Sequence, residues 1–274
     1  MSWCLVASME RSDRGSESGA DGLQTLAIAL ELIEELQTAN GATVAELQDR
    51  LDLSKSAIYN HLNTLREYGY VVKEGDRFQL SLTFTLIGEF VREQFELFSI
   101  AKSEIDEFSS EIGFPAHLIT EQHHNRLEVY VTRESDAIGT KSYSVYDPLH
   151  FHTTANGKSM LAFMDEDKRE AILDKHGLPR QSTNTITDRD ELAEELDLIR
   201  ERGYSVSKGE EMEGLWGVGA PVKGQDGSVA GALSISGPVG QLPEDRIHDE
   251  LGEAVVNTAD AIQLDLIMAS RTEQ

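Results

Sequence analysis

The chain has 274 residues, of which 39% are hydrophobic, so it can form one large domain or two modest ones. It carries 49 acidic residues against 24 lysines and arginines, a formal net charge of −25. No apolar run approaches the ~18 residues that a membrane span needs, which favours a soluble protein without a membrane partner. Cys4 is the only cysteine, so a disulfide framework and a thiolate metal site are excluded, as expected in a reducing cytoplasm.

The acidic surplus argues at first against a nucleic-acid partner, because proteins that bind nucleic acid usually carry a basic surface. The acidic residues are spread along the whole chain, and only nine lysines accompany them. A hydrated carboxylate shell suits a protein that works at high salt, where charge repulsion is screened within about 3 Å. We therefore favour a salt-adapted, halophile-like surface over an acidic interaction arm.

The first residues are predicted to be a tail. Residues 1–8 are briefly apolar but lack the basic start of a secretion signal, and Met9 offers a second start. We expect residues 1–8 to be an over-extended reading frame or a loose tail. Residues 10–22 are rich in Ser, Gly and charge, so residues 1–21 are predicted to be disordered.

A first helix is predicted from Leu23, and Asn40-Gly41 is a typical helix end. Its apolar residues recur at spacings of three and four and predict one apolar stripe. The members of this stripe are Leu23, Leu26, Ala27, Leu30, Ile33 and Leu36.

Two more helices and a hairpin follow. Thr43 and Glu46 have the spacing of a capping box and begin a short second helix with Val44, Leu47 and Leu51 on one face. Ser54 is the predicted cap of a third helix that runs to about Tyr68, and residues 70–80 read as two strands around a glycine turn. Three helices and a hairpin within about 60 residues predict a winged helix-turn-helix DNA-binding domain over residues 22–82. The inward residues of the third helix are Ile58, Leu62 and Leu65.

The outward face of the third helix has the chemistry of a recognition helix, although an ordinary polar helix face would look similar. Lysine and arginine suit phosphate or guanine, asparagine suits adenine, and tyrosine suits phosphate or a thymine methyl group. His61 lies beside the inward stripe, as a packed neutral histidine or a flanking contact. The predicted DNA-binding residues are Ser54, Lys55, Ser56, Tyr59, Asn60, Asn63 and Arg66, with Arg77 from the wing.

This module is itself acidic, because residues 21–82 hold ten acidic residues and five lysines and arginines. Only Glu67 intrudes on the recognition helix. We hypothesise that the protein binds double-stranded DNA at high salt through base contacts and bound cations, with little counterion release.

The remainder predicts a linker helix over residues 83–97 and a second domain over residues 98–270. A helix over 100–112 ends at Gly113, and alternating residues predict strands at 116–120 and 127–132. Helices at 156–176 and 188–202, strands at 215–222 and 228–236, and a closing helix at 246–268 complete the pattern. Strands and helices mix without a βαβ rhythm, so the predicted fold class is α+β with a central antiparallel sheet.

Residues 47–62 resemble the helix-turn-helix of the IclR family of transcriptional regulators. The second domain resembles the same family in Thr154–Ala162, Thr183–Thr187, Arg202–Tyr204, Glu213-Gly214 with Ala220–Val222, and Ser234–Pro238. These signatures cover about residues 22–268 in family order. The resemblance implies a GAF-like effector-binding domain and dimers, or dimers of dimers, on palindromic operators. It also implies control of catabolic genes, as repressor or activator, by an organic acid or a sugar-derived metabolite.

The resemblance further implies an effector site. Its anion would lie against the amides of Ala155 and Asn156, with Gly157 next, as a helix start attracts anions; a plain capped helix is the alternative. Ser234 and Ser236 share one strand face, although such hydroxyls can equally bond backbone. Ser207 and Gly217 stand where a glyoxylate-type sensor has an acid and a cysteine. Leu215 and Trp216 line the pocket or belong to the core.

Other functions have weaker support. His150 and His152 alternate on an expected strand, but no third ligand follows at metal spacing, so we expect neither a metal nor another cofactor. Gly157-Lys158-Ser159 lacks the first glycine of a phosphate-binding loop, where His152 stands, and no hydrolase or metalloprotease motif occurs. We therefore do not expect an enzyme; a small-molecule sensor without DNA contact is the other alternative.

Overall fold

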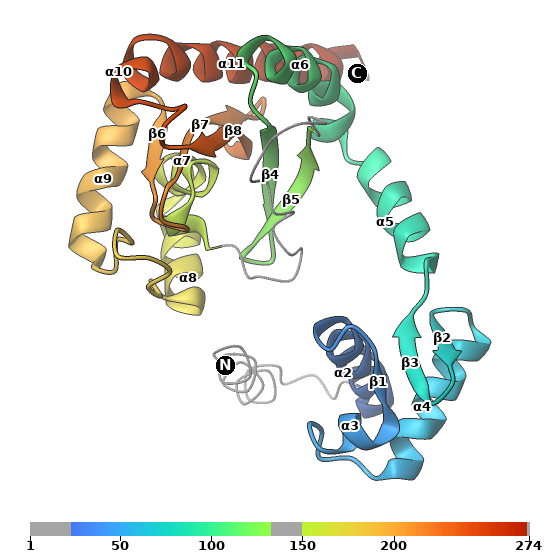
Figure 1. The fold of residues 1–274 in the computed structure, drawn as a ribbon. Coiled ribbons are helices and arrows are strands. Elements are labelled where there is room, and N and C mark those ends of the chain that lie inside the picture. The colour runs from blue at the N-terminus through green and yellow to red at the C-terminus, as the bar shows by residue number, and fades with distance from the viewer. Residues whose placement is uncertain (1–22, 133–149, 273–274) are drawn as a thin grey trace. The chain divides into compact units, whose positions relative to one another are not determined.

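A computed structural model describes residues 23–132 and 150–272 (Figure 1). The predicted tail of residues 1–21, including the doubtful residues 1–8, lies outside these ranges. The chain divides into two compact units, one ending at Gly88 and one beginning at Glu89. Each unit has its own hydrophobic core.

The N-terminal unit is a winged helix-turn-helix. Its strands form a three-stranded antiparallel sheet in the order β1-β3-β2. Its elements are α2 (Gln24–Thr38), β1 (Ala42–Thr43), α3 (Val44–Gln48), α4 (Lys55–Glu67), β2 (Val71–Glu74) and β3 (Arg77–Leu80).

Local hydrogen bonds set the boundaries of these helices. After α2 the chain turns through Asn40 (φ 49°) and Gly41 (φ 88°), left-handed conformations that asparagine and glycine tolerate best. The capping box is present: Glu46 N donates to Thr43 Oγ1 at 3.2 Å, and Thr43 N donates to Glu46 Oε2 at 2.7 Å. Ala57 N donates to Ser54 Oγ at 3.2 Å at the start of α4. The sequence predicted all three features: the helix end at Asn40-Gly41, the capping box, and the cap at Ser54.

The buried face of α2 matches only part of the predicted stripe, since Leu36 is buried as predicted but most of the other members are exposed. Leu32 and Leu36 are the buried residues of the helix, with Ile28 packed beside them. Leu23, Leu26 and Leu30 are 77%, 59% and 53% exposed. Both sets have helical spacing, so the periodicity alone could not distinguish the core face from a second apolar face.

Two helices follow the N-terminal sheet. The predicted linker helix is α5 (Thr83–Glu93), of which no residue is buried. The next helix, α6 (Glu96–Ile112), begins four residues before the predicted start and ends at Gly113, whose φ is 76°.

The C-terminal unit is built on a five-stranded sheet in the order β5-β4-β8-β7-β6, in which every neighbouring pair is antiparallel. Four strands occur where the sequence predicted them. The fifth, β6, is a four-residue edge strand that was not predicted. The strands are β4 (Ala116–Gln122), β5 (Asn125–Val131), β6 (Ser205–Lys208), β7 (Leu215–Lys223) and β8 (Val229–Pro238).

Helices cover both faces of this sheet, as Figure 1 shows. On one face, α6 and α11 (Gly252–Thr272) pack over the larger hydrophobic core. The predicted closing helix is α11, which is preceded by a short helix, α10 (Glu244–Arg246), and a π-helical turn at Ile247–Leu251. On the other face lie α7 (Ala155–Phe163), α8 (Glu166–His176) and α9 (Arg189–Arg202). The predicted helix over 156–176 is thus two helices, divided where Asp165 caps α8.

Candidate effector pocket and recognition helix

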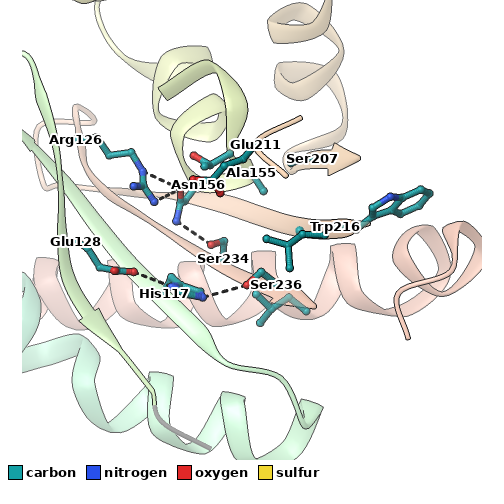
Figure 2. Close-up of a pocket in the computed structure, with 14 residues that line it drawn as sticks. His117, Arg126, Glu128, Ala155, Asn156, Ser207, Glu211, Trp216, Ser234 and Ser236 are labelled. Atoms are coloured by element: carbon teal, nitrogen blue, oxygen red, sulfur yellow. Dashed lines mark hydrogen bonds and ion pairs between the residues drawn. The ribbon is translucent and has the colours of Figure 1, made fainter. Parts of the chain in front are cut away.

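A pocket lies between the start of α7 and the sheet of the C-terminal unit (Figure 2). Its free volume is about 50 Å³, which would hold roughly three to five water molecules. The pocket therefore suits a small ligand.

Small side chains on the α7 face of the sheet make this space. The cross-strand register aligns Ser205, Gly219, Ser234 and His117 in one row. Ser207, Gly217 and Ser236 form the next row. At Gly219 the backbone of α7 comes so close that an added Cβ would lie 2.9 Å from Asn156 N. Two rows of glycine and serine thus let the start of the helix approach the sheet.

The pocket gathers seven of the eight effector residues predicted from the sequence: Ala155, Asn156, Ser207, Leu215, Gly217, Ser234 and Ser236. Gly157 does not line it. Gly157 N donates to the Oγ1 of Thr154, the residue that caps α7, at 3.2 Å. A Cβ at this position would lie 2.2 Å from the carbonyl oxygen of Phe151. Gly157 therefore allows the turn before α7 to pack closely against the start of the helix.

One chain of hydrogen bonds joins Arg126 to Ser234 through Asn156. Arg126 on β5 donates from Nε and Nη2 to Asn156 Oδ1 at 3.2 and 3.0 Å, and Asn156 Nδ2 donates to Ser234 Oγ at 2.9 Å. Because the amide has a donor on one side and an acceptor on the other, its orientation is defined. Arg126 Nη1 is buried without a hydrogen-bond partner among the residues that the structure describes. Burial lowers the pKa of Arg126, opposed by the charges of Glu211 and Glu128.

A second chain crosses three strands. Glu128 Oε1 on β5 lies 2.7 Å from His117 Nδ1 on β4, and His117 Nε2 lies 3.1 Å from Ser236 Oγ on β8. Burial would raise the pKa of Glu128, but the hydrogen bond and charge of His117, together with the charge of Arg126, outweigh it and lower that pKa. Figure 2 shows the two chains, one ending at Ser234 and the other at Ser236 on the same strand.

The other predicted lining residues have different surroundings. Ser207 Oγ donates to the carbonyl of Thr153 at 2.8 Å, so the hydroxyl braces the turn before α7. Trp216 is half-buried beneath the ammonium of Lys208, which lies 5.5 Å from its ring centroid. Gly217 has Ala155 opposite it, 3.5 Å from where a Cβ would stand.

Sequence reasoning missed six lining residues: His117, Arg126, Glu128, Thr154, Glu211 and Ile235. The first three lie on β4 and β5, both of which were predicted, but no motif marked the residues that face α7. The available signal was a pair of charged residues two positions apart, Glu128 within the predicted strand at 127–132 and Arg126 directly before it, because alternate residues of a strand share a face.

The predicted DNA-binding residues come together on the N-terminal unit. Ser54, Lys55, Ser56, Tyr59, Asn60 and Arg66 are exposed, whereas Ile58 and Leu62 are fully buried. Asn63 is half-buried, and its Oδ1 has no hydrogen-bond partner in the described part of the chain. His61 is half-buried beside the core face. The outward face of α4 therefore has the composition expected of a recognition helix.

Arg77 is hydrogen bonded to other residues of the N-terminal unit. Its Nη1 lies 3.1 Å from Glu46 Oε2, and its Nη2 donates to the carbonyl of Gly41. A DNA contact by Arg77 would therefore compete with these bonds.

Lys73 on β2 was missed as a candidate. Its ammonium lies 5.9 Å from the ring centroid of Tyr59 and 5.1 Å from that of Phe78. The ammonium of Lys73, on the wing, therefore lies beside Tyr59, an outward residue of α4.

The histidine pair has a different setting from the expected one. His150 and His152 do not alternate on a strand, because Phe151–Thr153 form a 3₁₀ turn. His152 is buried, and its Nε2 lies 3.1 Å from the carbonyl of Pro179. Burial lowers its pKa to about 4, and the nearby His150 and Lys158 add to the shift. No group of three potential metal ligands occurs in residues 23–132 and 150–272.

Comparison with known proteins decides the family. The IclR helix-turn-helix domain matches residues 25–75, and the domain described as "Bacterial transcriptional regulator IclR C-terminal" matches residues 90–264. The chain belongs to the IclR family. Its IclR fold is also that of the solved Thermotoga maritima IclR, which has a TM-score of 0.71 and 26% identity and covers 90% of this chain and 100% of that one.

Two relatives of this IclR-family protein are similar over most of their length. The "Probable HTH-type transcriptional regulator ArcR" of Halobacterium salinarum is 31% identical over 87% of this chain and 92% of its own. The "HTH-type transcriptional regulator KdgR" of Escherichia coli is also 31% identical, over 90% and 92%. The protein is thus an effector-responsive, DNA-binding transcriptional regulator. No helix in its described part is long and apolar enough to cross a membrane.

Proposed function

We propose that this regulator binds a palindromic operator through α4, works in the cytoplasm, and responds to a small organic acid or sugar-derived acid bound in the pocket. One observation carries the effector assignment. Seven predicted residues from α7, β6, β7 and β8 line one pocket that also holds the cation of Arg126. The first-turn amides of α7, at Ala155 and Asn156, precede the first intrahelical hydrogen bonds and favour an anion.

The DNA half of the proposal is tested by a gel shift with the DNA upstream of the protein's own gene. Asn60→Ala removes an exposed amide suited to adenine, so we expect about a 5- to 100-fold weaker complex. Gln37→Ala, on the exposed side of α2, is the control and should bind as the unaltered protein does. An unchanged affinity in Asn60→Ala would remove this residue from the interface, and no shift of any upstream fragment would refute the proposal.

We further infer that the protein is a homodimer or homotetramer. The support is the apolar surface of α5 and the residue before it: Leu82, Leu86, Phe90 and Val91 are each more than half exposed. Apolar residues that recur along one exposed helix are typical of a covered interface. Light scattering after gel filtration should report a dimer or tetramer, and Phe90→Glu should shift it towards the monomer. A monomeric unaltered protein at micromolar concentration would refute this inference.

The Glu128–His117–Ser236 chain has the atom connectivity of a hydrolase triad. We nevertheless propose that it positions hydroxyl groups and performs no hydrolysis. Ser236 lies within a regular strand, not on an exposed turn that would present it to a substrate carbonyl. p-Nitrophenyl acetate should therefore be hydrolysed at the background rate. Hydrolysis that is lost in Ser236→Ala would overturn this assignment.

A further inference from the structure

The C-terminal unit has a second hollow, between the segment that joins α8 to α9 and the turn that follows β6. Its free volume is about 610 Å³, within the range of roughly 300–1,000 Å³ that is usual for small-molecule sites. Nine residues line it, and of these Trp216 alone also lines the effector pocket. Figure 2 shows the indole of Trp216 directed away from Asn156 and Ser234. The second hollow is therefore a separate site with one shared wall.

Hydrogen bonds fix the walls of the second hollow to each other. Thr185 Oγ1, from the segment before α9, donates to the carbonyl of Glu210 at 2.6 Å. Asn184 Nδ2 donates to the carbonyl of Lys208 at 3.0 Å. Since these bonds hold the backbone on both sides, a ligand would enter a preformed site and order few groups on binding.

Four charged side chains line the second hollow, two cations and two carboxylates. One of each sign has a partner outside it: Lys208 donates to Glu244, and Lys158 Nζ donates to Glu210 Oε1 at 2.7 Å. The other oxygen of Glu210, Oε2, is buried and has no hydrogen-bond partner in the described part of the chain. Because a buried acceptor without a donor is unfavourable, Glu210 Oε2 is suited to accept a hydrogen bond from a ligand.

The remaining cation and carboxylate, Arg180 and Glu191, form no ion pair within residues 23–132 and 150–272. Arg180 donates to the carbonyl of Thr183 at 3.3 Å and to Thr187 Oγ1 at 3.2 Å, and both of these acceptors are uncharged. Glu191 is exposed in the first turn of α9. An anion would be repelled by Glu191 and a cation by Arg180. The lining therefore favours a ligand without net charge.

We propose that the second hollow binds a neutral sugar. Each sugar hydroxyl both donates and accepts, so neighbouring hydroxyls can donate to Glu210 and Glu191 and accept from Arg180. The half-buried indole of Trp216 adds an apolar surface for the C–H groups of the sugar ring. This site goes beyond the effector assignment, because none of the three charged residues lines the effector pocket.

The test is calorimetric titration of the full chain with glucose, xylose and maltose. Glucose 6-phosphate, glucosamine and alanine are the anionic, cationic and zwitterionic comparisons. We expect at least one neutral sugar to bind, and to bind about 10-fold or more tightly than each charged compound, since each of these places a charge against a like charge of the lining. No binding of any neutral sugar at tens of millimolar overturns the proposal. Equal or tighter binding of a charged compound also overturns it.

Two variants test the residues with the sugar that binds. Glu191→Ala removes an exposed acceptor and should weaken binding about 10-fold, without a change in thermal stability. Glu194→Ala, exposed on the same helix, is the matched control and should bind as the unaltered protein does. Glu210→Gln replaces the free acceptor by a donor and should weaken binding about 10- to 100-fold. Thermal unfolding checks its fold, and Glu191→Ala decides the test if Glu210→Gln does not fold.

Ser234→Ala distinguishes the two sites, because Ser234 lines the effector pocket and not the second hollow. The sugar should bind this variant with unchanged affinity. Loss of sugar binding in Ser234→Ala, with unchanged binding in Glu191→Ala, would place the sugar in the effector pocket and overturn the inference. A protein that shifts its upstream DNA but binds no sugar retains the proposed function and overturns this inference alone. A protein that binds the sugar as expected but shifts no upstream DNA refutes the DNA half of the proposed function and supports the second site.

Discussion

Lys158 is the most deeply buried charged side chain among the described residues, at 1% exposure, and its partners explain how it is tolerated. Its ammonium donates to Val206 O and Glu210 Oε1, both at 2.7 Å, and to Glu195 Oε1 at 3.3 Å. Burial raises the pKa of Glu210 despite the opposing charge of Lys158. The lysine of the Gly-Lys-Ser sequence is therefore a structural cation and not part of a phosphate-binding loop.

Replacing Lys158 should destabilise the effector domain. Lys158→Met leaves the Glu210 carboxylate buried without its cation, which costs about 3–5 kcal/mol of unfolding free energy. Urea unfolding followed by Trp216 fluorescence measures the loss. The double variant Lys158→Met with Glu210→Leu removes the orphaned charge and should recover part of the stability. A single variant as stable as the unaltered protein would contradict the assigned role.

His152 should make stability depend on pH. Its pKa is about 4 in the folded protein and near 6.5 in the unfolded chain, so the unfolded state takes up a proton first as the pH falls. Stability is then fully present above about pH 6.5 and is lost towards pH 4. Between pH 8 and pH 5 the loss from this group is about 2 kcal/mol. In urea unfolding at pH 8 and pH 5, the free energy of unfolding of His152→Gln should fall by about 2 kcal/mol less than that of the unaltered protein. An equal fall in the two proteins would refute the lowered pKa of His152.

Individual residues were predictable from the sequence where a local rule applies. The caps at Thr43 with Glu46 and at Ser54, and the shared strand face of Ser234 and Ser236, follow from spacing, because a cap and a strand face depend only on neighbours in the chain. The family resemblance was needed to place the two serines in a pocket. Arg126 and Glu128 were missed because their role depends on which face of β5 meets α7. Arg77 was predicted as a wing contact, and only the structure revealed its bonds to Glu46 and Gly41.

At the scale of elements, the turn before α7 packs closely against the first residues of that helix at Gly157. Gly157 was expected to bind the effector, and the structure instead gives it contact with the backbone of Phe151. Gly157→Ala should therefore lower the unfolding free energy by about 1–3 kcal/mol, since the backbone must move to admit a methyl group. Thermal or urea unfolding measures this effect.

Gly240 offers a matched control, because no atom lies within 4 Å of the position where its Cβ would stand. Gly240→Ala should change stability by no more than about 0.5 kcal/mol. Equal stability of the two alanine variants would contradict the packing role of Gly157.

Element positions were predictable wherever periodicity and end signals agreed, as for α4, α9 and the strands β4, β5, β7 and β8. The prediction failed where two apolar patterns overlap. In α2 the exposed leucines and the buried Leu32 and Leu36 both repeat at helical intervals. The edge strand β6 has only four residues, too few for alternation to distinguish it from a turn.

For the whole molecule, charge governs the expected DNA binding. Of the five basic residues in the N-terminal module, Arg50 lies 3.5 Å from Glu35 and Arg77 is paired with Glu46. Lys55, Arg66 and Lys73 remain as candidates for phosphate contact. We therefore expect the logarithm of affinity to fall against the logarithm of salt concentration with a slope no steeper than about −3 per DNA-binding unit. Fluorescence anisotropy from 0.1 to 2 M potassium chloride measures it, and a slope near −8 per unit would contradict the salt-adapted interpretation.

The strands of the effector domain separate two requirements that a sensor must satisfy. Val218, Leu233 and Ile235 face α6 and α11 and build the core, whereas their immediate neighbours Gly217, Ser234 and Ser236 face α7 and border the pocket. Substitutions on the pocket side can therefore alter which metabolite is recognised while the hydrophobic side continues to hold the domain together. Such a sheet can acquire new chemical preferences through single changes, without a compensating change in its core.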